Sequence, residues 1–259
     1  MRDHVLSAAD AKEVEWPLAS SPPELAKGEV HLWSISLQAP PEKLDQLQTR
    51  LDAEEAERAR RFLFDQHRRR FIAGRAALRA ILGLYLSCPP DRIEFGYEGL
   101  GKPYLSGATP RAPLHFNLSN SGEMAVVAIT AERPLGVDIE FTPRRCDFAA
   151  LAKRYFSREE QQELFDLPAD LHRSAFFRCW TRKEAMLKAT GTGLTFPLDR
   201  FVVSLRAEDP PRVLSIEGCE VRAREWWLAS FSQHPDYEIA LALLGEPAGV
   251  KRMEWAEAS

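Results

Sequence analysis

Two carboxylates occur at strand spacing in the segment 136–140. Asp138 and Glu140 alternate with apolar residues, so a strand here places both carboxylates on one face. Two like charges this close repel one another unless a cation lies between them. Oxygen ligands of this kind suit Mg²⁺, which also binds the phosphate groups of substrates. The alternative is an ordinary strand of a half-exposed sheet, in which polar and apolar residues also alternate.

A second set of polar residues occurs at helical spacing. Trp180, Glu184 and Lys188 recur every four residues and therefore share one stripe of a helix. A surface Glu–Lys pair at this spacing stabilises a helix by only about 0.3–0.5 kcal/mol and is the plainer interpretation. The tryptophan on the same stripe indicates a partly buried face, where an acid and a base are better suited to proton transfer. With the two strand carboxylates, this set could hold a divalent cation and act on a phosphate ester.

Three further features could bind phosphate groups. Ser119 and Asn120 begin a predicted turn over residues 119–122, whose hydroxyls and amides could hold phosphate oxygens or simply form the turn. Lys102 lies in a Gly-Lys-Pro segment and is either an exposed loop lysine or a phosphate ligand. Eight arginines lie between residues 58 and 79, beginning with Arg58, against one acid. They form either a solvated helix face or a set of counter-charges for a polyanion.

Composition restricts the class of protein. The chain has 259 residues, of which 45% are hydrophobic and 28% charged, as in ordinary globular proteins, and its net charge of −4 argues against a general nucleic-acid binder. The four cysteines show no zinc or disulfide spacing, which favours a reducing compartment. The N-terminus lacks a signal peptide, and no apolar run approaches the roughly 18 residues of a membrane span. We therefore expect a cytoplasmic protein that binds neither membranes nor nucleic acid.

The predicted elements follow the order strand, helices, strands, and then the same order again. We expect an α+β protein with a loose N-terminal arm at 1–28, an N-terminal half at 29–132, and a C-terminal half at 133–259 that carries the carboxylates. A main helix is predicted from about 171 to 190, with Gly191 ending it. The segment 157–160 has the pattern of a capping box at the start of another helix.

The order of these motifs resembles the Sfp-type 4′-phosphopantetheinyl transferases. The resemblance covers roughly residues 55–245 and is carried by six elements in the expected order. These are Gly101-Lys102-Pro103-Tyr104-Leu105, Phe116-Asn117-Leu118-Ser119-Asn120-Ser121, Gly136-Val137-Asp138-Ile139-Glu140, Phe156-Ser157-Arg158-Glu159-Glu160, Trp180-Thr181-Arg182-Lys183-Glu184 with Lys188, and Gly191-Thr192-Gly193-Leu194. The order and spacing of six elements are far more specific than any one of them.

The resemblance implies a fold and a reaction. The fold would be a monomer of two similar α+β halves related by a pseudo-twofold axis, with the active site in the cleft between them. The reaction would move 4′-phosphopantetheine from coenzyme A to a serine of an apo acyl or peptidyl carrier protein and release adenosine 3′,5′-bisphosphate. The implied cofactor is Mg²⁺, with Mn²⁺ as an alternative.

The resemblance also implies roles for individual residues. Asp138, Glu140 and Glu184 would bind the metal ion, and Glu184, or a water that it holds, would deprotonate the serine. Lys188 would neutralise or protonate the leaving group. The implied contacts to coenzyme A phosphates are made by Arg58, Lys102, Ser119, Asn120, Lys183 and Lys188. Where this chain has Asn120, the family commonly has a histidine, so an uncharged amide replaces a cation that would bind the 3′-phosphate.

Two other functions compete with the transferase. The first is a non-catalytic protein that binds coenzyme A or a carrier domain, although such a protein need not retain the three carboxylates and Lys188. The second is a metal-dependent phosphoesterase, for which the motifs lack a histidine or further acid to position water. The sequence does not identify the carrier protein, the tolerance for acyl-coenzyme A, or the role of residues 1–28.

Overall fold

The computed structural model describes residues 16–98, 101–107, 114–191, 196–246 and 248–257. The described chain forms two compact units. The N-terminal unit contains Trp16–Pro134 together with the C-terminal segment from Ala248, and the C-terminal unit contains the segment from Leu135 to Pro247. Residues 1–15 of the predicted arm and residues 192–194 of the predicted glycine motif lie outside the described residues.

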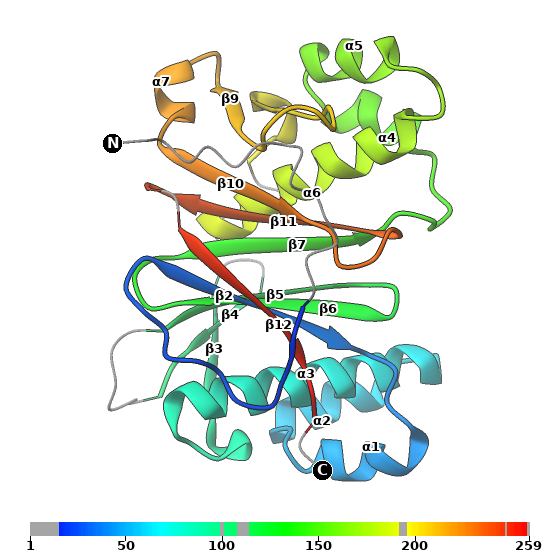
Figure 1. Cartoon of the computed structure of the whole chain (residues 1–259). Helices are drawn as coiled ribbons and strands as arrows, with labels where there is room; N and C mark the ends of the chain where they lie inside the picture. The colour runs from blue at the N-terminus through cyan, green and yellow to red at the C-terminus, as the bar shows by residue number, and fades with distance from the viewer. Residues whose placement is uncertain (1–15, 99–100, 108–113, 192–195, 247, 258–259) are drawn as a thin grey trace. The chain divides into compact units, whose positions relative to one another are not determined.

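The N-terminal unit is built on a five-stranded sheet (Figure 1). Its order is β1 (Leu18–Ala19), β12 (Gly249–Trp255), β2 (Glu29–Ser36), β6 (Met124–Thr130) and β5 (His115–Ser121). The strand β12 is parallel to both β1 and β2, whereas β6 is antiparallel to β2 and β5. A separate two-stranded hairpin is formed by β3 (Phe95–Glu98) and β4 (Lys102–Leu105).

This sheet corrects the predicted boundaries at both ends of the chain. We expected residues 133–259 to form one half, but residues 249–255 pair with β2 in the N-terminal unit. The predicted loose arm also contributes a strand, because Leu18 and Ala19 pair with Glu254 and Trp255. The physical reason is that a strand is stabilised by backbone hydrogen bonds to any open sheet edge, whatever its distance along the sequence.

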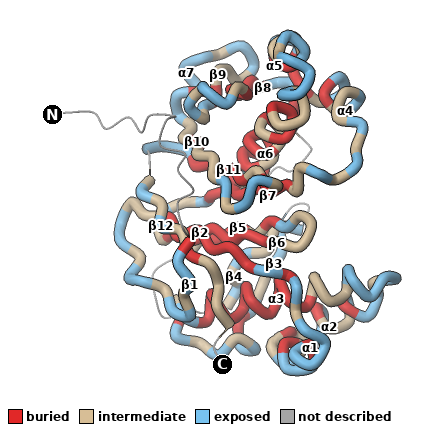
Figure 2. Tube along the Cα trace, turned by 45° about the vertical axis from the view of Figure 1, so that its right-hand side comes forward, coloured by how far each residue is buried: buried red, intermediate tan, exposed pale blue. Residues whose placement is uncertain are grey.

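The described part of the N-terminal unit contains three α-helices. They are α1 (Pro41–Gln48), α2 (Ala53–Arg60) and α3 (Asp65–Leu86), and a 3₁₀ turn, η2 (Pro90–Arg92), follows α3. Of these helices, α3 packs against β2, while the other two pack against α3. Asp52 caps α2 in a complete capping box with Glu55. Figure 2 shows that β2, β6 and much of α3 are buried. The apolar core of the unit includes Trp33, Ile35, Ile72, Leu78, Ile81, Leu82, Val127 and Ile129.

The C-terminal unit is built on a three-stranded antiparallel sheet in the order β10 (Trp226–Phe231), β11 (Tyr237–Leu244) and β7 (Leu135–Phe141). The long helix α6 (His172–Thr190) packs on β7 and β11 (Figure 1). The remaining elements are α4 (Phe148–Tyr155), α5 (Arg158–Asp166), the 3₁₀ turn η4 (Leu198–Arg200), β8 (Phe201–Val203), β9 (Val213–Ile216) and α7 (Glu220–Ala223). The apolar core of the unit includes Phe156, Phe176, Phe177, Cys179, Met186, Leu187 and Leu228.

Local signals in the sequence are confirmed at two helix ends. Ser157 and Glu160 form the predicted capping box at the start of α5. Gly191 ends α6 with a φ of 71°, a left-handed conformation that glycine adopts at little cost. The mixed α+β class is likewise confirmed by the elements of both units.

The predicted turn at 119–122 is shorter than expected. Strand β5 continues to Ser121, because Asn120 pairs with Ala125 and Ser121 pairs with Met124. The turn is therefore restricted to Gly122 and Glu123, with Gly122 at a φ of 58°. A two-residue hairpin of this kind needs positive φ, which explains the glycine.

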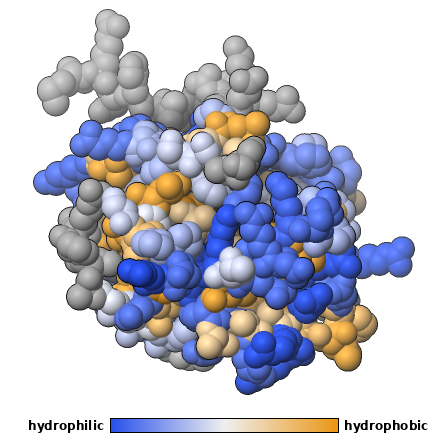
Figure 3. All heavy atoms as spheres, turned by 90° about the horizontal axis from the view of Figure 1, so that it is seen from below, coloured by the Kyte–Doolittle hydropathy of each residue, from blue (hydrophilic) through white to orange (hydrophobic). Residues whose placement is uncertain are grey.

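The surface seen in Figure 3 is mainly hydrophilic, with separate apolar patches. Within the part of the chain that the structure describes, every helix falls short of the length and apolar character needed to cross a bilayer.

Candidate active site

The two strand carboxylates lie on the face of β7 that α6 covers. Gly136, Asp138 and Glu140 alternate along β7 and pair across the sheet with Ala242, Ala240 and Glu238. Residues paired across adjacent strands share a face. Both alanines belong to the apolar cluster that α6 helps to form, so this is the helix-covered face. Asp138 and Glu140 are both buried.

Gly136 allows the backbone of α6 to lie directly on β7. A Cβ atom added at Gly136 would lie 2.0 Å from the carbonyl oxygen of Ala185 and 2.3 Å from the amide nitrogen of Ala189. No side chain fits at that distance. The glycine therefore sets the separation of helix and strand at the point where Glu184 and Lys188 face Asp138.

The helical stripe predicted from the sequence is partly buried, as expected. Trp180 is half-buried and its ring contacts those of Tyr155 and Phe176, with centroids 5.7 and 5.8 Å away. Two turns later, Lys188 Nζ donates to Asp138 Oδ1 over 2.6 Å. The structure therefore joins the strand motif to the helix motif by a direct ion pair.

Three charged side chains act on the carboxyl group of Glu184: Asp138, Lys188 and Glu140. Burial and the negative charge of Asp138 raise the pKa of Glu184 to about 7; Lys188 opposes this shift, and Glu140 adds a smaller increase. A carboxyl with a pKa near neutrality can take up or release a proton under physiological conditions. The three carboxylates and the lysine thus form one coupled group.

Glu140 has a cation of its own. Arg144 Nη2 lies 3.0 Å from Glu140 Oε1, four residues further along the chain. Lys188 and Arg144 therefore both bring positive charge to the carboxylate cluster. The donor chemistry of three carboxylates fits a hard divalent ion. Their arrangement here is one of ion pairs, and among the described residues no group of three His, Cys, Asp or Glu side chains is arranged to hold a metal ion.

Lys183 does not take the predicted position at a phosphate group. Its side chain is fully buried, and its Nζ lies 2.8 Å from Glu160 Oε2 while donating to the carbonyl oxygens of Leu198 and Phe201. The residue next to Glu184 points about 100° around the helix, away from the stripe. We therefore correct this prediction: Lys183 is part of a buried ion pair that connects α5, α6 and the start of β8.

Lys102, Ser119 and Asn120 lie in the N-terminal unit. Burial lowers the pKa of Lys102, an effect that Glu98 opposes, and Lys102 in turn lowers the pKa of His115 after the larger effect of burial. On β5, Ser119 is buried and Asn120 is exposed, as expected for adjacent residues of a strand. The two therefore face opposite sides of the sheet.

Arg58 is exposed on α2, and its guanidinium lies 5.2 Å from the ring centroid of Phe71. Two other arginines of the same cluster are buried and structural. Arg79 Nε donates to Glu55 over 2.6 Å, and Arg75 Nε lies 3.1 Å from the same carboxylate. The arginine cluster is thus divided between an exposed part and an internal network.

Sequence reasoning missed two residues of the carboxylate site. Gly136 was noted only as the start of a motif, although a glycine two residues before Asp138 on the same face was a signal of close packing. Arg144 was not considered, although its spacing of four residues from Glu140 is conspicuous. Asp138, Glu140, Glu184 and Lys188 are brought together in one unit, as the sequence predicted.

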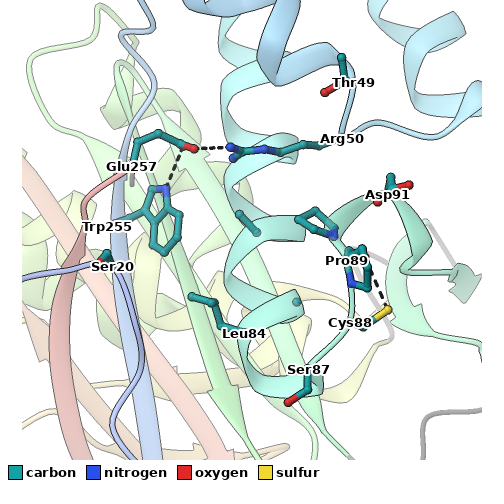
Figure 4. A pocket seen from close by; sticks show the side chains of 13 residues that line it. Ser20, Thr49, Arg50, Leu84, Ser87, Cys88, Pro89, Asp91, Trp255 and Glu257 are labelled. Carbon is teal, nitrogen blue, oxygen red and sulfur yellow. Dashed lines mark hydrogen bonds and ion pairs between the residues drawn. The ribbon is translucent and has the colours of Figure 1, made fainter. Parts of the chain in front are cut away.

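A pocket of about 920 Å³ opens elsewhere, in the N-terminal unit between α3 and β12 (Figure 4). Its walls include Leu84, Cys88 and Trp255, and the Trp255 indole nitrogen donates to Glu257, which also pairs with Arg50. None of the predicted site residues lines it.

Comparisons with known proteins agree with the motifs. The family profile described as "4'-phosphopantetheinyl transferase superfamily" matches residues 134–242, and the profile "4'-phosphopantetheinyl transferase, N-terminal" matches residues 37–132. The chain is 42% identical over 194 residues to "4'-phosphopantetheinyl transferase HetI" of Nostoc sp., covering 74% of this chain and 81% of that protein. It is 33% identical to a "4'-phosphopantetheinyl transferase" of Bacillus subtilis, covering 74% and 87%. It is 32% identical to "4'-phosphopantetheinyl transferase psf-1" of Bacillus pumilus, covering 82% and 86%.

Proposed function

We propose that this chain, which belongs to the 4′-phosphopantetheinyl transferase family, moves the 4′-phosphopantetheine group of coenzyme A to a serine of an apo carrier protein and releases adenosine 3′,5′-bisphosphate. The observation that carries the proposal is the coupled group on β7 and α6. There, Lys188 pairs with Asp138, and the burial and charges around Glu184 raise its pKa to about 7. Glu184 and Lys188 therefore supply an acid and a base, and the carboxylates beside them supply negative charge for a cation.

The reaction is a phosphoryl transfer in which one bond forms and one breaks. The serine Oγ bonds to the phosphorus that carries pantetheine, and the bond from that phosphorus to the bridging oxygen breaks. The bridging oxygen leaves with the electron pair as part of adenosine 3′,5′-bisphosphate. Such reactions are accelerated mainly by positioning and charge neutralisation. The side chains must therefore take one proton from the serine and stabilise negative charge on the leaving group.

We assign Glu184 as the base that accepts the serine proton. Its pKa of about 7 matches the operating pH, so a carboxylate form is available to accept the serine proton directly or through a water. Lys188, one turn along the helix, is partly exposed and can reach both Asp138 and a bound anion. We propose that Lys188 stabilises the negative charge that develops on the leaving group.

We further propose that Mg²⁺, with Mn²⁺ as an alternative, is held by Asp138, Glu140 and Glu184. When bound, it would supply positive charge to the pyrophosphate of coenzyme A. The support is the donor set itself and the mutual effect of the carboxylates on the pKa of Glu184. Burial is the largest cause of this raised pKa, and a cation among the carboxylates would remove the repulsion that adds to it.

The coenzyme A phosphates are assigned to Arg58, Lys102, Ser119 and Asn120 of the N-terminal unit. Arg58 is exposed on α2, and Lys102 and Ser119 occur in two different strands. The lowered pKa of Lys102 indicates a partly desolvated ammonium group, which would interact strongly with an anion. Lys183 is excluded from this set because it is buried against Glu160.

We propose a cytoplasmic location and a monomeric state. The described chain contains four free cysteines, at positions 88, 146, 179 and 219, which supports a reducing cytoplasm. A monomer is expected from the resemblance alone and is checked by sedimentation velocity. The carrier protein, of acyl or peptidyl type, has to be identified by assay.

Intact-protein mass spectrometry tests the proposal. An apo carrier protein is incubated with this enzyme, coenzyme A and Mg²⁺, and the mass gain of one phosphopantetheine group is followed over time. We expect the gain to be lost with Glu184→Gln and with a chelator. It should be retained with Glu220→Gln, a matched change at an exposed position of α7.

The controls separate the competing functions. No gain with fatty-acid, polyketide or peptide carriers, while coenzyme A still binds, would favour a non-catalytic binding protein. Release of free phosphopantetheine without any carrier would favour a phosphoesterase. Transfer that persists in excess chelator would leave the transferase standing but remove the metal ion from the proposal.

A further inference from the structure

Arg144 follows β7 in a segment whose backbone is fixed by neighbouring elements. The amide of Thr142 donates to the carbonyl oxygen of Asp236 over 2.8 Å, and its hydroxyl donates to the same oxygen. Arg173, on α6, donates to the carbonyl oxygens of Thr142 and Arg144. The position of the Arg144 main chain is therefore set relative to β7 and α6, whereas its side chain is held separately.

The side chain of Arg144 makes a single ion pair at the carboxylate cluster. Its Nη2 lies 3.0 Å from Glu140 Oε1, and its guanidinium carbon lies 5.3 Å from the ring centroid of Phe177. The Nε–H is buried, and no acceptor among the described residues is within hydrogen-bond distance of it. A guanidinium has five N–H donors, so Glu140 satisfies only part of its capacity.

The two side chains of this ion pair differ in their exposure to solvent. The Arg144 side chain is 38% exposed and the Glu140 side chain is 11% exposed. Arg144 is therefore the more solvent-accessible partner of this ion pair, and a dissolved anion can reach its guanidinium. Ion pairs of this exposure are weak and easily exchanged.

In the proposed reaction, Arg144 would exchange its partner Glu140 for the pyrophosphate of coenzyme A. If Glu140 binds a metal ion, its oxygen is no longer available to Arg144, and the positive guanidinium is left beside the metal. The pyrophosphate that the same metal binds would supply acceptor oxygens. A planar guanidinium suits phosphate because two parallel N–H groups can donate to two of its oxygens.

We infer that Arg144 is a phosphate-binding residue of the donor site, which pairs with Glu140 in the ligand-free protein and with the pyrophosphate of coenzyme A in the complex. The inference rests on the proposed function, since it takes coenzyme A as the ligand. It assigns to the C-terminal unit a cation in addition to Lys188. The Phe177 ring contacts the guanidinium of Arg144, and the guanidinium carbon of Arg173 also lies 5.4 Å from the centroid of this ring.

Isothermal titration of coenzyme A, without any carrier protein, tests the inference. Four proteins are compared: the wild type, Arg144→Gln, Arg144→Lys and Arg145→Gln. Arg145 is the matched control, because it is the adjacent arginine and is exposed. Each protein is titrated once with Mg²⁺ and once with excess chelator, and thermal melts establish that each is folded.

We expect Arg144→Gln to weaken coenzyme A binding about tenfold or more with Mg²⁺, which is the usual effect of a lost hydrogen bond to a charged group. The loss should be smaller in chelator, where Glu140 still competes for the guanidinium. The affinity of Arg144→Lys for coenzyme A should lie between those of the wild type and Arg144→Gln, since lysine keeps the charge but not the paired donors. Arg145→Gln should remain within about twofold of the wild type, since solvent screens an exposed charge.

Two results would overturn the inference. Equal affinities for Arg144→Gln and Arg145→Gln would show that Arg144 does not contact the ligand. A loss of the same size in chelator as with Mg²⁺ would show that Arg144 does not leave Glu140 in exchange for the metal ion. The titration needs no carrier protein, so it measures the role of Arg144 in coenzyme A binding independently of the transfer reaction. A protein that binds coenzyme A but fails the transfer assay would contradict the proposed function alone.

Discussion

Replacing Gly136 by alanine should damage the active site through the packing of one helix. The added Cβ would lie 2.0 Å from the Ala185 carbonyl oxygen, whereas real Cβ contacts essentially never fall below 3.0 Å. Relieving the overlap requires a displacement of about 1 Å, and the atoms in the way are helix backbone, which cannot rotate aside. The whole of α6 must therefore move away from β7, or the strand must bend.

The expected size follows from this displacement. Overpacking a close contact typically costs about 1–3 kcal/mol. For a protein of this length, each kcal/mol lowers the melting temperature by about 2–4 °C. Glu184 and Lys188 move with α6 relative to Asp138, and a misplacement of about 1 Å in a catalytic group can cost about 100-fold in rate. Activity should therefore fall much further than stability.

The assay compares Gly136→Ala with Gly249→Ala. Gly249 begins β12, and its added Cβ would be 3.9 Å from the nearest atom, the Cγ of Glu29. We expect Gly249→Ala to leave the melting temperature and kcat/KM near those of the wild type. If Gly136→Ala behaves in the same way, then α6 does not lie on β7 as described, and our account of how the site is positioned is wrong.

Three further predictions concern single side chains. The pKa of Glu184 is raised by burial to about 7, above its ordinary value of 4.5, so its stabilising contribution is complete below about pH 4.5 and is lost as the pH rises through about 7. In chelator, the melting temperature of Glu184→Gln relative to wild type should therefore increase between about pH 5 and about pH 8, and parallel curves by differential scanning fluorimetry would contradict this. Lys183→Met leaves Glu160 buried without its cation and should cost about 3–5 kcal/mol in chemical denaturation, whereas the double variant with Glu160→Gln should recover part of this loss. Asn120→His replaces an exposed amide by an imidazole that can carry positive charge. It should lower the KM for coenzyme A in steady-state transfer assays, and an unchanged KM would show that this position does not limit binding.

Local patterns in the sequence predicted the strand and the helix that carry the proposed active-site residues, for a simple reason. Alternation places Asp138 and Glu140 on one face of a strand, and a spacing of four places Glu184 and Lys188 on one stripe of a helix, whatever the rest of the chain does. Helix caps are equally local, which is why Ser157 was correctly predicted as a cap.

The tertiary structure decided which of these faces meet. Periodicity says that Lys183 lies on a different face from Glu184, but only packing shows that this face is the core and that Glu160 is its partner. The glycine at 136 becomes informative once α6 is known to lie on it. The pairing of β12 with β2 joins segments more than 200 residues apart, which no local pattern encodes.

The sequence by itself therefore determined the chemical groups and their local geometry. Backbone dihedrals and side-chain direction depend on neighbours within a few residues, so motifs can be recognised without a fold. Burial, pKa values and ion-pair partners depend on atoms distant in sequence. For this reason the approach of α6 to β7, the pKa of Glu184 and the position of Arg144 could be found only in the folded protein.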